Sequence, residues 1–324
     1  MKRSVYIIIY LILPLSALAE VSKPIVTPTP SNLISSEGYP EDLTKAIESI
    51  NNGSYEQALK ELKKITAPKK IIRRQKKGHS VKIVPPEQQA YLKGVALRKM
   101  GRAKEAVKAL QSSLALRGSN SDAIAELGYA FLATGDSEKA FQKFKEALWF
   151  GNLRDHSTAE LLYQIGVFYQ NKGNLAAAKT NYNQALNNDP AYSLASLKLA
   201  EIYFADGAKK QAITLLKTAQ NRDPQNEALR GALAKTLLVN VDPLIDDDDV
   251  KLALEVISPL IQNKFGKDRY LNQFFPTYIK ALLLNDKLDF ADKEVSEALA
   301  INKKDPNLQR LAQQIKLEKA AKDL

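Results

Sequence analysis

The 324-residue sequence contains no cysteine and only two histidines, His79 and His156. The absence of cysteine excludes disulfide bonds, thiolate metal sites, cysteine nucleophiles and cysteine-linked lipid anchors. Both histidines lie in expected loops with no spaced nucleophile or metal ligand nearby. The sequence also lacks His-Glu-x-x-His, Gly-x-Ser-x-Gly and the glycine-rich fingerprints of phosphate and dinucleotide sites. We therefore expect a non-enzymatic protein with no catalytic residue, metal or cofactor.

Long apolar runs are scarce, and the one that stands out lies at the N-terminus. It follows Lys2 and Arg3, and it extends from Val5 to Ala19 over 15 residues, fewer than the ~20 that span a bilayer. Its last residues, Ala-Leu-Ala, have the small-x-small pattern that signal peptidase accepts. These features predict a cleaved signal peptide over residues 1–19, with an uncleaved anchor as the alternative. We expect an exported chain, periplasmic or secreted, that is soluble after cleavage.

Residues 20–40 contain four prolines, which prevent regular helix and favour extended chain. We interpret this segment as a Pro-rich linker. A peptide docked on a partner is the alternative.

Small residues recur at fixed spacing in the middle of the chain. The intervals 34, 38 and 34 separate the members of two such sets. The sets are Gly94, Gly128, Gly166 and Ala200, and Ala106, Ala140, Ala178 and Ala212. Apolar residues between them follow a helical period, and each unit contains a turn glycine. Each unit is therefore predicted to be two antiparallel helices that approach closely at the small residues. The longer interval places four extra residues in the loop 150–158.

This pattern resembles the tetratricopeptide repeat family. The resemblance rests on the small residue early in the first helix, a bulky residue three later, the turn glycine, the alanine of the second helix and a closing proline. The tryptophan frequent in the family is replaced by Ala90, Ile124, Leu162 and Ser196. The resemblance implies an all-α solenoid of about seven helical hairpins with a C-terminal capping helix. Organellar 35-residue repeats and Sel1-type repeats are the alternatives.

The same resemblance divides the chain into segments. It implies a divergent N-terminal repeat at 41–66, a basic insert at 67–86, four well-matched units at 87–224, two divergent repeats at 225–302 and the capping helix at 303–324. An acidic stretch, Asp246–Asp249, precedes an expected helix, where carboxylates favour the positive helix end. A weak cation site is the alternative there.

In this family the first helices line a concave groove that binds a peptide or a helix. Carried over by position, the resemblance implies an apolar groove with a few charges. Its residues are Tyr91, Arg98, Tyr129, Leu132, Tyr163, Val167, Leu197, Glu201 and Phe204. The alternative is that these residues pack against neighbouring helices. The clamp that binds acidic chaperone tails is absent, because Tyr91 and Val95 stand at its Lys and Asn positions.

The net charge is +11, and positive residues concentrate in the insert at 69–77. The cluster is formed by Lys69, Lys70, Arg73, Arg74, Lys76 and Lys77. Such a cluster attracts anionic surfaces. No aromatic residues interleave for base stacking, so we expect no nucleic-acid partner. A solvated loop without a ligand is the plainer interpretation.

Together these features predict a non-catalytic scaffold or adaptor of the cell envelope that binds a protein or peptide partner. The alternative function is a module that binds the membrane surface or an envelope polyanion through the basic insert.

Overall fold

The structure, a computed structural model, describes Ile34 and residues 41–65, 84–239, 246–264, 270 and 273–322. Every regular element in these residues is a helix, which confirms the predicted all-α class. The helices are α2 Glu41–Asn51, α3 Tyr55–Lys64, α4 Pro86–Lys99, α5 Ala103–Leu116, α6 Ser121–Ala133, α7 Ser137–Phe150, α8 Thr158–Asn171, α9 Leu175–Asn188, α10 Ser193–Ala205, α11 Lys209–Arg222, α12 Glu227–Leu237, α13 Asp247–Gln262, α15 Phe275–Leu284, α16 Leu288–Ile301 and α17 Pro306–Lys322.

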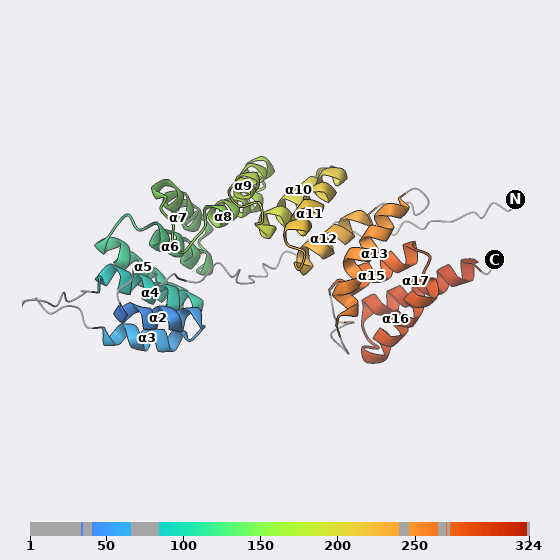
Figure 1. Ribbon diagram of the computed structural model, residues 1–324, viewed down its shortest axis with the longest axis horizontal. Helices are drawn as coiled ribbons and strands as arrows, with labels where there is room; N and C mark the ends of the chain where they lie inside the picture. Colours follow the sequence, from blue (N-terminus) through green and yellow to red (C-terminus); the bar gives the residue numbers. More distant parts are fainter. Residues whose placement is uncertain are drawn as a thin grey trace, which may run out of the picture.

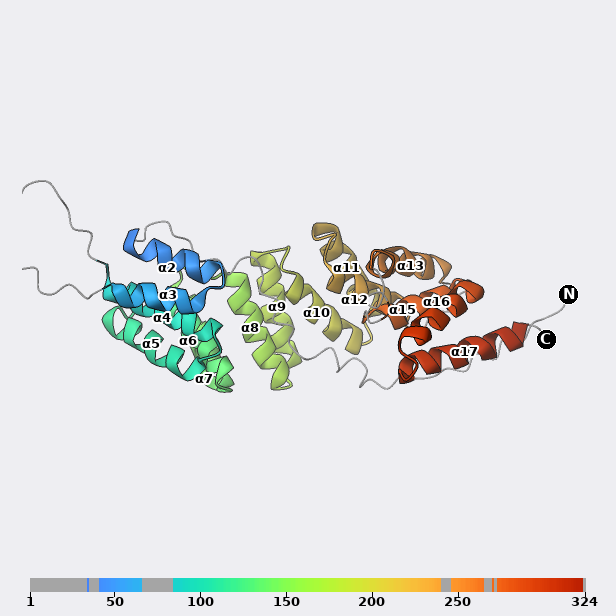
Figure 2. The same cartoon turned by 90° about the horizontal axis from the view of Figure 1, so that it is seen from below.

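Successive helices pack as antiparallel hairpins that stack into a solenoid. The described helices form seven such pairs, from α2 with α3 to α15 with α16, and α17 packs on α16 at the end of the array. Both views show an elongated molecule (Figures 1 and 2), and Figure 1 shows that it is arched, with α6 and α8 on the inner side of the arch and α7 and α9 on its outer side. The predicted helical solenoid with a capping helix is therefore confirmed.

In six of the seven hairpins, the turn between the two helices contains one residue with a positive φ. Gly101 follows α4 with φ 77°, and the next backbone amide, that of Arg102, donates to the carbonyl of Leu97 at 2.9 Å. This bond closes the helix end and reverses the chain. Gly135 and Gly173 act in the same way. Asp286 takes this conformation in the α15–α16 turn, which explains why that repeat lacks the glycine signal.

The recurring glycines lie where two helices of one hairpin touch. A Cβ atom at Gly94 would lie 2.5 Å from the Leu110 side chain, and one at Gly166 would lie 2.5 Å from the ring of Tyr182. The same holds for Gly128 against Phe144, at 2.7 Å. The facing alanines of the second helices, Ala106, Ala140, Ala178 and Ala212, are all fully buried. Close approach of the two backbones thus requires the small residues.

Among the described helices, none is both long and apolar enough to cross a membrane. Ile34 is buried against the first hairpin, where its backbone amide and carbonyl form hydrogen bonds of 2.9 and 3.0 Å with the Asn51 side chain. The chain before α2 therefore contacts the repeat at this point.

Candidate functional site

The inner face of the molecule is closed at α6. Nine of its thirteen residues are buried, and these include Asp122 and Glu126, which a solvated helix face would expose. The cause is the loop 151–157, which holds the four extra residues of the 38-residue interval between Gly128 and Gly166. Within it, Asp155 and His156 are 7% and 9% exposed. Asp155 and His156 therefore fold inward, whereas Asn152 and Arg154 of the same loop are exposed.

Backbone and side-chain hydrogen bonds hold this loop against α4 and α6. The backbone amides of Arg154 and Asp155 donate to the Asp122 carboxylate at 3.1 and 3.0 Å. The Tyr91 hydroxyl donates to Asp155 Oδ2 at 2.8 Å. Ser121 donates from its hydroxyl to the carbonyl of Gly151. The loop thus contacts both of the hairpins that precede it in the sequence.

His156 lies between two carboxylates at the centre of a buried charge cluster. Its Nε2 is 3.3 Å from Glu126 Oε1, and its Nδ1 is 3.5 Å from Glu160 Oε2. Arg98 binds Glu126 through Nε and Nη2 at 2.5 and 2.9 Å, and the Tyr129 hydroxyl donates to Glu160 at 2.7 Å. These partners were not identified from the sequence: Glu126 comes from the preceding hairpin, and Glu160 lies four residues after His156 on α8.

The cluster fixes the charge states of its members. Burial lowers the pKa of His156, but the carboxylates of Glu126 and Glu160 outweigh it and raise the pKa to about 10. Burial raises the pKa of Glu126, yet Arg98 and His156 hold it well below its usual range. The same balance lowers the pKa of Glu160, chiefly through His156. At neutral pH the cluster therefore contains two cations, Arg98 and His156, and two anions, Glu126 and Glu160.

This charge balance points to a structural cluster. Arg98 donates to Glu126, Tyr129 donates to Glu160, and the His156 imidazolium forms an ion pair with each of the two glutamates. Arg98 also lies 5.5 Å above the Tyr129 ring, which stacks on His156 at 5.4 Å. Among the residues that the structure describes, no group of three acidic or histidine side chains could hold a metal ion.

Three residues of the predicted groove belong to this closed region. Tyr91 is only 1% exposed because the loop covers it, and Arg98 and Tyr129 are tied to the two glutamates. They lie beneath or beside the loop rather than along an open groove. Leu132, at the far end of α6, is 39% exposed. No sequence pattern marked the closure, since a four-residue insertion does not indicate the direction in which it folds.

The remaining predicted groove residues form a second, more open face on α8 and α10. Tyr163 and Val167 lie one turn apart on α8, and Leu197, Glu201 and Phe204 lie on one side of α10. All five are half-buried. We call these five residues the α8–α10 face.

Electrostatic contacts show that the two helices contribute to one surface. Burial, and then the Glu201 carboxylate, raise the pKa of Tyr163 to about 12. The Tyr163 ring also packs 5.6 Å from that of Tyr192, which precedes α10. Lys198 pairs with Glu201 at 2.8 Å. The face therefore combines apolar side chains with one ion pair.

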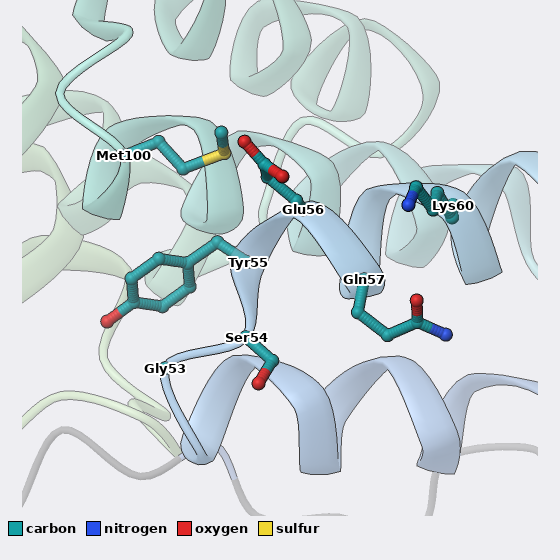
Figure 3. Close-up of a pocket in the computed structure, with 7 residues that line it drawn as sticks. All are labelled: Gly53, Ser54, Tyr55, Glu56, Gln57, Lys60 and Met100. Atoms are coloured by element: carbon teal, nitrogen blue, oxygen red, sulfur yellow. The ribbon is translucent and has the colours of Figure 1, made fainter.

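A shallow hollow of about 550 Å³ lies outside both regions, at the start of α3 beside Met100 (Figure 3). The side chains of Tyr55, Gln57 and Lys60 point away from one another around it. Gln57 and Lys60 are exposed, so the hollow has no buried group that would position a ligand.

The predicted polyanion patch at 69–77 and the predicted signal peptide at 1–19 lie outside the described residues. Both stay predictions from the sequence.

Comparison with known proteins identifies the repeat. Residues 91–155 and 171–236 match the tetratricopeptide repeat family. No sequence match is found among curated proteins.

Solved structures resemble the fold at low sequence identity. The C-terminal part of a repeat-containing protein from Cytophaga hutchinsonii shares 15% identity at a TM-score of 0.59, over 83% of this chain and 98% of that one. PilF from Pseudomonas aeruginosa shares 15% identity at a TM-score of 0.53, over 71% and 97% of the two chains. These likenesses establish the architecture alone.

Proposed function

This chain is a tetratricopeptide-repeat protein, and on that premise we propose that it is an exported, non-catalytic scaffold that binds a peptide or helix of a partner protein on the α8–α10 face. The family builds surfaces for protein–protein interaction. We further propose which surface of this molecule binds the partner and in which compartment the protein acts.

One observation carries the place of binding: the inner face is closed over α4 and α6 and open over α8 and α10. Tyr91 is fully covered, whereas Tyr163, Leu197 and Phe204 keep part of their surface exposed. The face combines aromatic and aliphatic side chains with a central ion pair. In protein-binding surfaces, such apolar side chains supply most of the affinity, and polar groups fix the position of the partner along the surface. A short apolar segment with one or two charges suits it.

Non-catalytic action is supported by the buried cluster. Its ionisable groups are engaged with one another and lie under the loop, so they do not converge on a space that a substrate could occupy. Export is supported by the sequence features of residues 1–19. N-terminal sequencing of the protein from its host should begin at Glu20; a chain that begins at Met1 would contradict the cleavage.

Site-specific photo-crosslinking in the native host tests the binding face. A photoreactive residue at position 197 should capture a defined partner, identified by mass spectrometry. The matched control places the same residue at position 175, since Leu175 is 38% exposed at the start of α9 and outside the face. Leu197→Glu should abolish crosslinking from a photoreactive residue at position 204, whereas Leu175→Glu should not. Equal capture from positions 197 and 175, or no capture from either, contradicts the proposal.

A further inference from the structure

One long edge of the solenoid gathers the connections between successive hairpins. Gln89, at the start of α4, donates to the carbonyl of Ile65 just after α3 at 3.1 Å. Ser113, in the last turn of α5, donates to the carbonyl of Glu87 at 2.7 Å. Ser121, at the start of α6, bonds to the residue that follows α7. The C-terminal ends of α3, α5 and α7 therefore share this edge.

Large apolar side chains protrude at this edge. Leu116 at the end of α5 is 58% exposed, and Trp149 at the end of α7 is 80% exposed. Phe150 is 36% exposed and touches Trp149 edge to face, with ring centroids 5.0 Å apart. Tryptophan is highly buried on average in soluble proteins, and an exposed aromatic pair marks a contact surface. We call Leu116, Arg117, Trp149 and Phe150 the loop edge.

The charge at this edge is positive. Arg117 is exposed directly after Leu116. Lys63 and Lys64 are exposed in the last turn of α3, whose C-terminal end shares this edge. The complementary partner is anionic.

We propose that the loop edge docks the molecule on the surface of an anionic lipid bilayer. Trp149, Phe150 and Leu116 enter the headgroup boundary, where amphipathic aromatic rings are favoured. Arg117, Lys63 and Lys64 attract the lipid phosphates. A stable protein interface buries a much larger continuous area than three side chains at two helix ends supply, whereas shallow insertion into a bilayer needs no such area. This surface is separate from the α8–α10 face and leaves it free.

Trp149 is the only tryptophan of the chain, so tryptophan fluorescence reports on this contact alone. Protein purified from its host is mixed with vesicles of phosphatidylethanolamine and phosphatidylglycerol, or with vesicles of phosphatidylcholine. With the anionic vesicles, emission should shift to shorter wavelength, and lipids brominated near the headgroup should quench it. Added salt should weaken the binding.

Two variants with the same N-terminus make the test specific. Leu116→Glu with Phe150→Glu should lower the vesicle partition constant by roughly tenfold to a hundredfold, since two inserting side chains become charged. The control Leu175→Glu, at the opposite edge, should bind like the wild type. The proposal fails if no vesicle binding occurs or if both variants bind equally. It also fails if the emission shifts with protein concentration alone and sedimentation shows a dimer, which would make a second copy the partner.

Discussion

At the residue scale, His156 decides how the stability of the N-terminal half depends on pH. Its pKa is raised in the folded protein to about 10, from an unfolded value of about 6.5. The folded state therefore binds a proton more tightly, and this contribution is fully present below the unfolded pKa and is lost as pH rises through the folded one. The lowered pKa values of Glu126 and Glu160 act in the opposite sense, because their contribution is lost as the solution becomes acidic.

We expect the melting midpoint of the wild type to fall as pH rises from neutrality toward about 10. His156→Gln keeps a polar side chain but cannot carry the charge. The difference between wild type and variant should be largest near pH 6 and should shrink on the alkaline side, as followed by circular dichroism at a series of pH values. A constant difference across that range would contradict the assignment of the charge to His156.

Glu126 faces both cations of the cluster, so its loss is expected to be more costly than loss of a surface carboxylate. Glu126→Gln leaves Arg98 and His156 buried with one anion fewer, and the free energy of unfolding should fall by about 3–5 kcal/mol. Glu105→Gln is the control, because Glu105 forms an exposed pair with Arg102 and should leave the melting midpoint nearly unchanged. Urea titration of both variants measures the contrast.

At the element scale, the hairpin depends on close helix contact rather than on helix propensity. Propensity alone would make Gly166→Ala stabilising by ~1 kcal/mol. The added Cβ would instead lie 2.5 Å from the Tyr182 ring, which is buried and held by a 2.6 Å hydrogen bond to Gln170. We expect a net loss of about 1–3 kcal/mol.

Gly118→Ala provides the matched comparison, since a Cβ there meets only the Leu114 carbonyl at 3.8 Å. It should be neutral or slightly stabilising in the same urea titration. Equal effects of the two substitutions would show that packing does not explain the recurring glycines.

The sequence predicted these hairpins because periodic spacing reports a local contact. Gly94 faces Leu110 and Gly128 faces Phe144 within a single unit, so each repeat contains both partners. The closure of α6 could not be predicted in this way. Glu126 is a surface residue by its type, and its partners Arg98 and His156 come from the preceding hairpin and from an inserted loop of unknown direction.

The same limit explains the less regular C-terminal part. Gly231 on α12 packs against Phe274, which follows a long connection rather than a fixed repeat interval. A Cβ atom at Gly231 would overlap that ring. Spacing alone gives no sign of this contact.

At the scale of the whole molecule, the loop joins neighbouring hairpins of an array that is otherwise held by nearest-neighbour contacts. Arg98 lies on α4, Glu126 on α6 and Glu160 on α8, so one cluster spans three hairpins. These hairpins are expected to open together. None of the described residues beyond α10 belongs to the cluster.

Hydrogen exchange followed by mass spectrometry checks this coupling. In Glu126→Gln, the amide protection of α4 to α8 should fall as one unit, while that of α12 to α16 should stay close to the wild type. A loss confined to α6, or a uniform loss along the chain, would show that the cluster does not join the three hairpins.

The bridging loop also has a mechanical consequence. A solenoid of stacked hairpins can bend at every interface between neighbouring units. Where the loop and its charge cluster link three units, these interfaces bend less, so the N-terminal half is more rigid than the rest of the solenoid. Bending under load is then concentrated beyond α8, so the curvature of the surface around α10 and α12 can adjust to a partner while the other half keeps its shape.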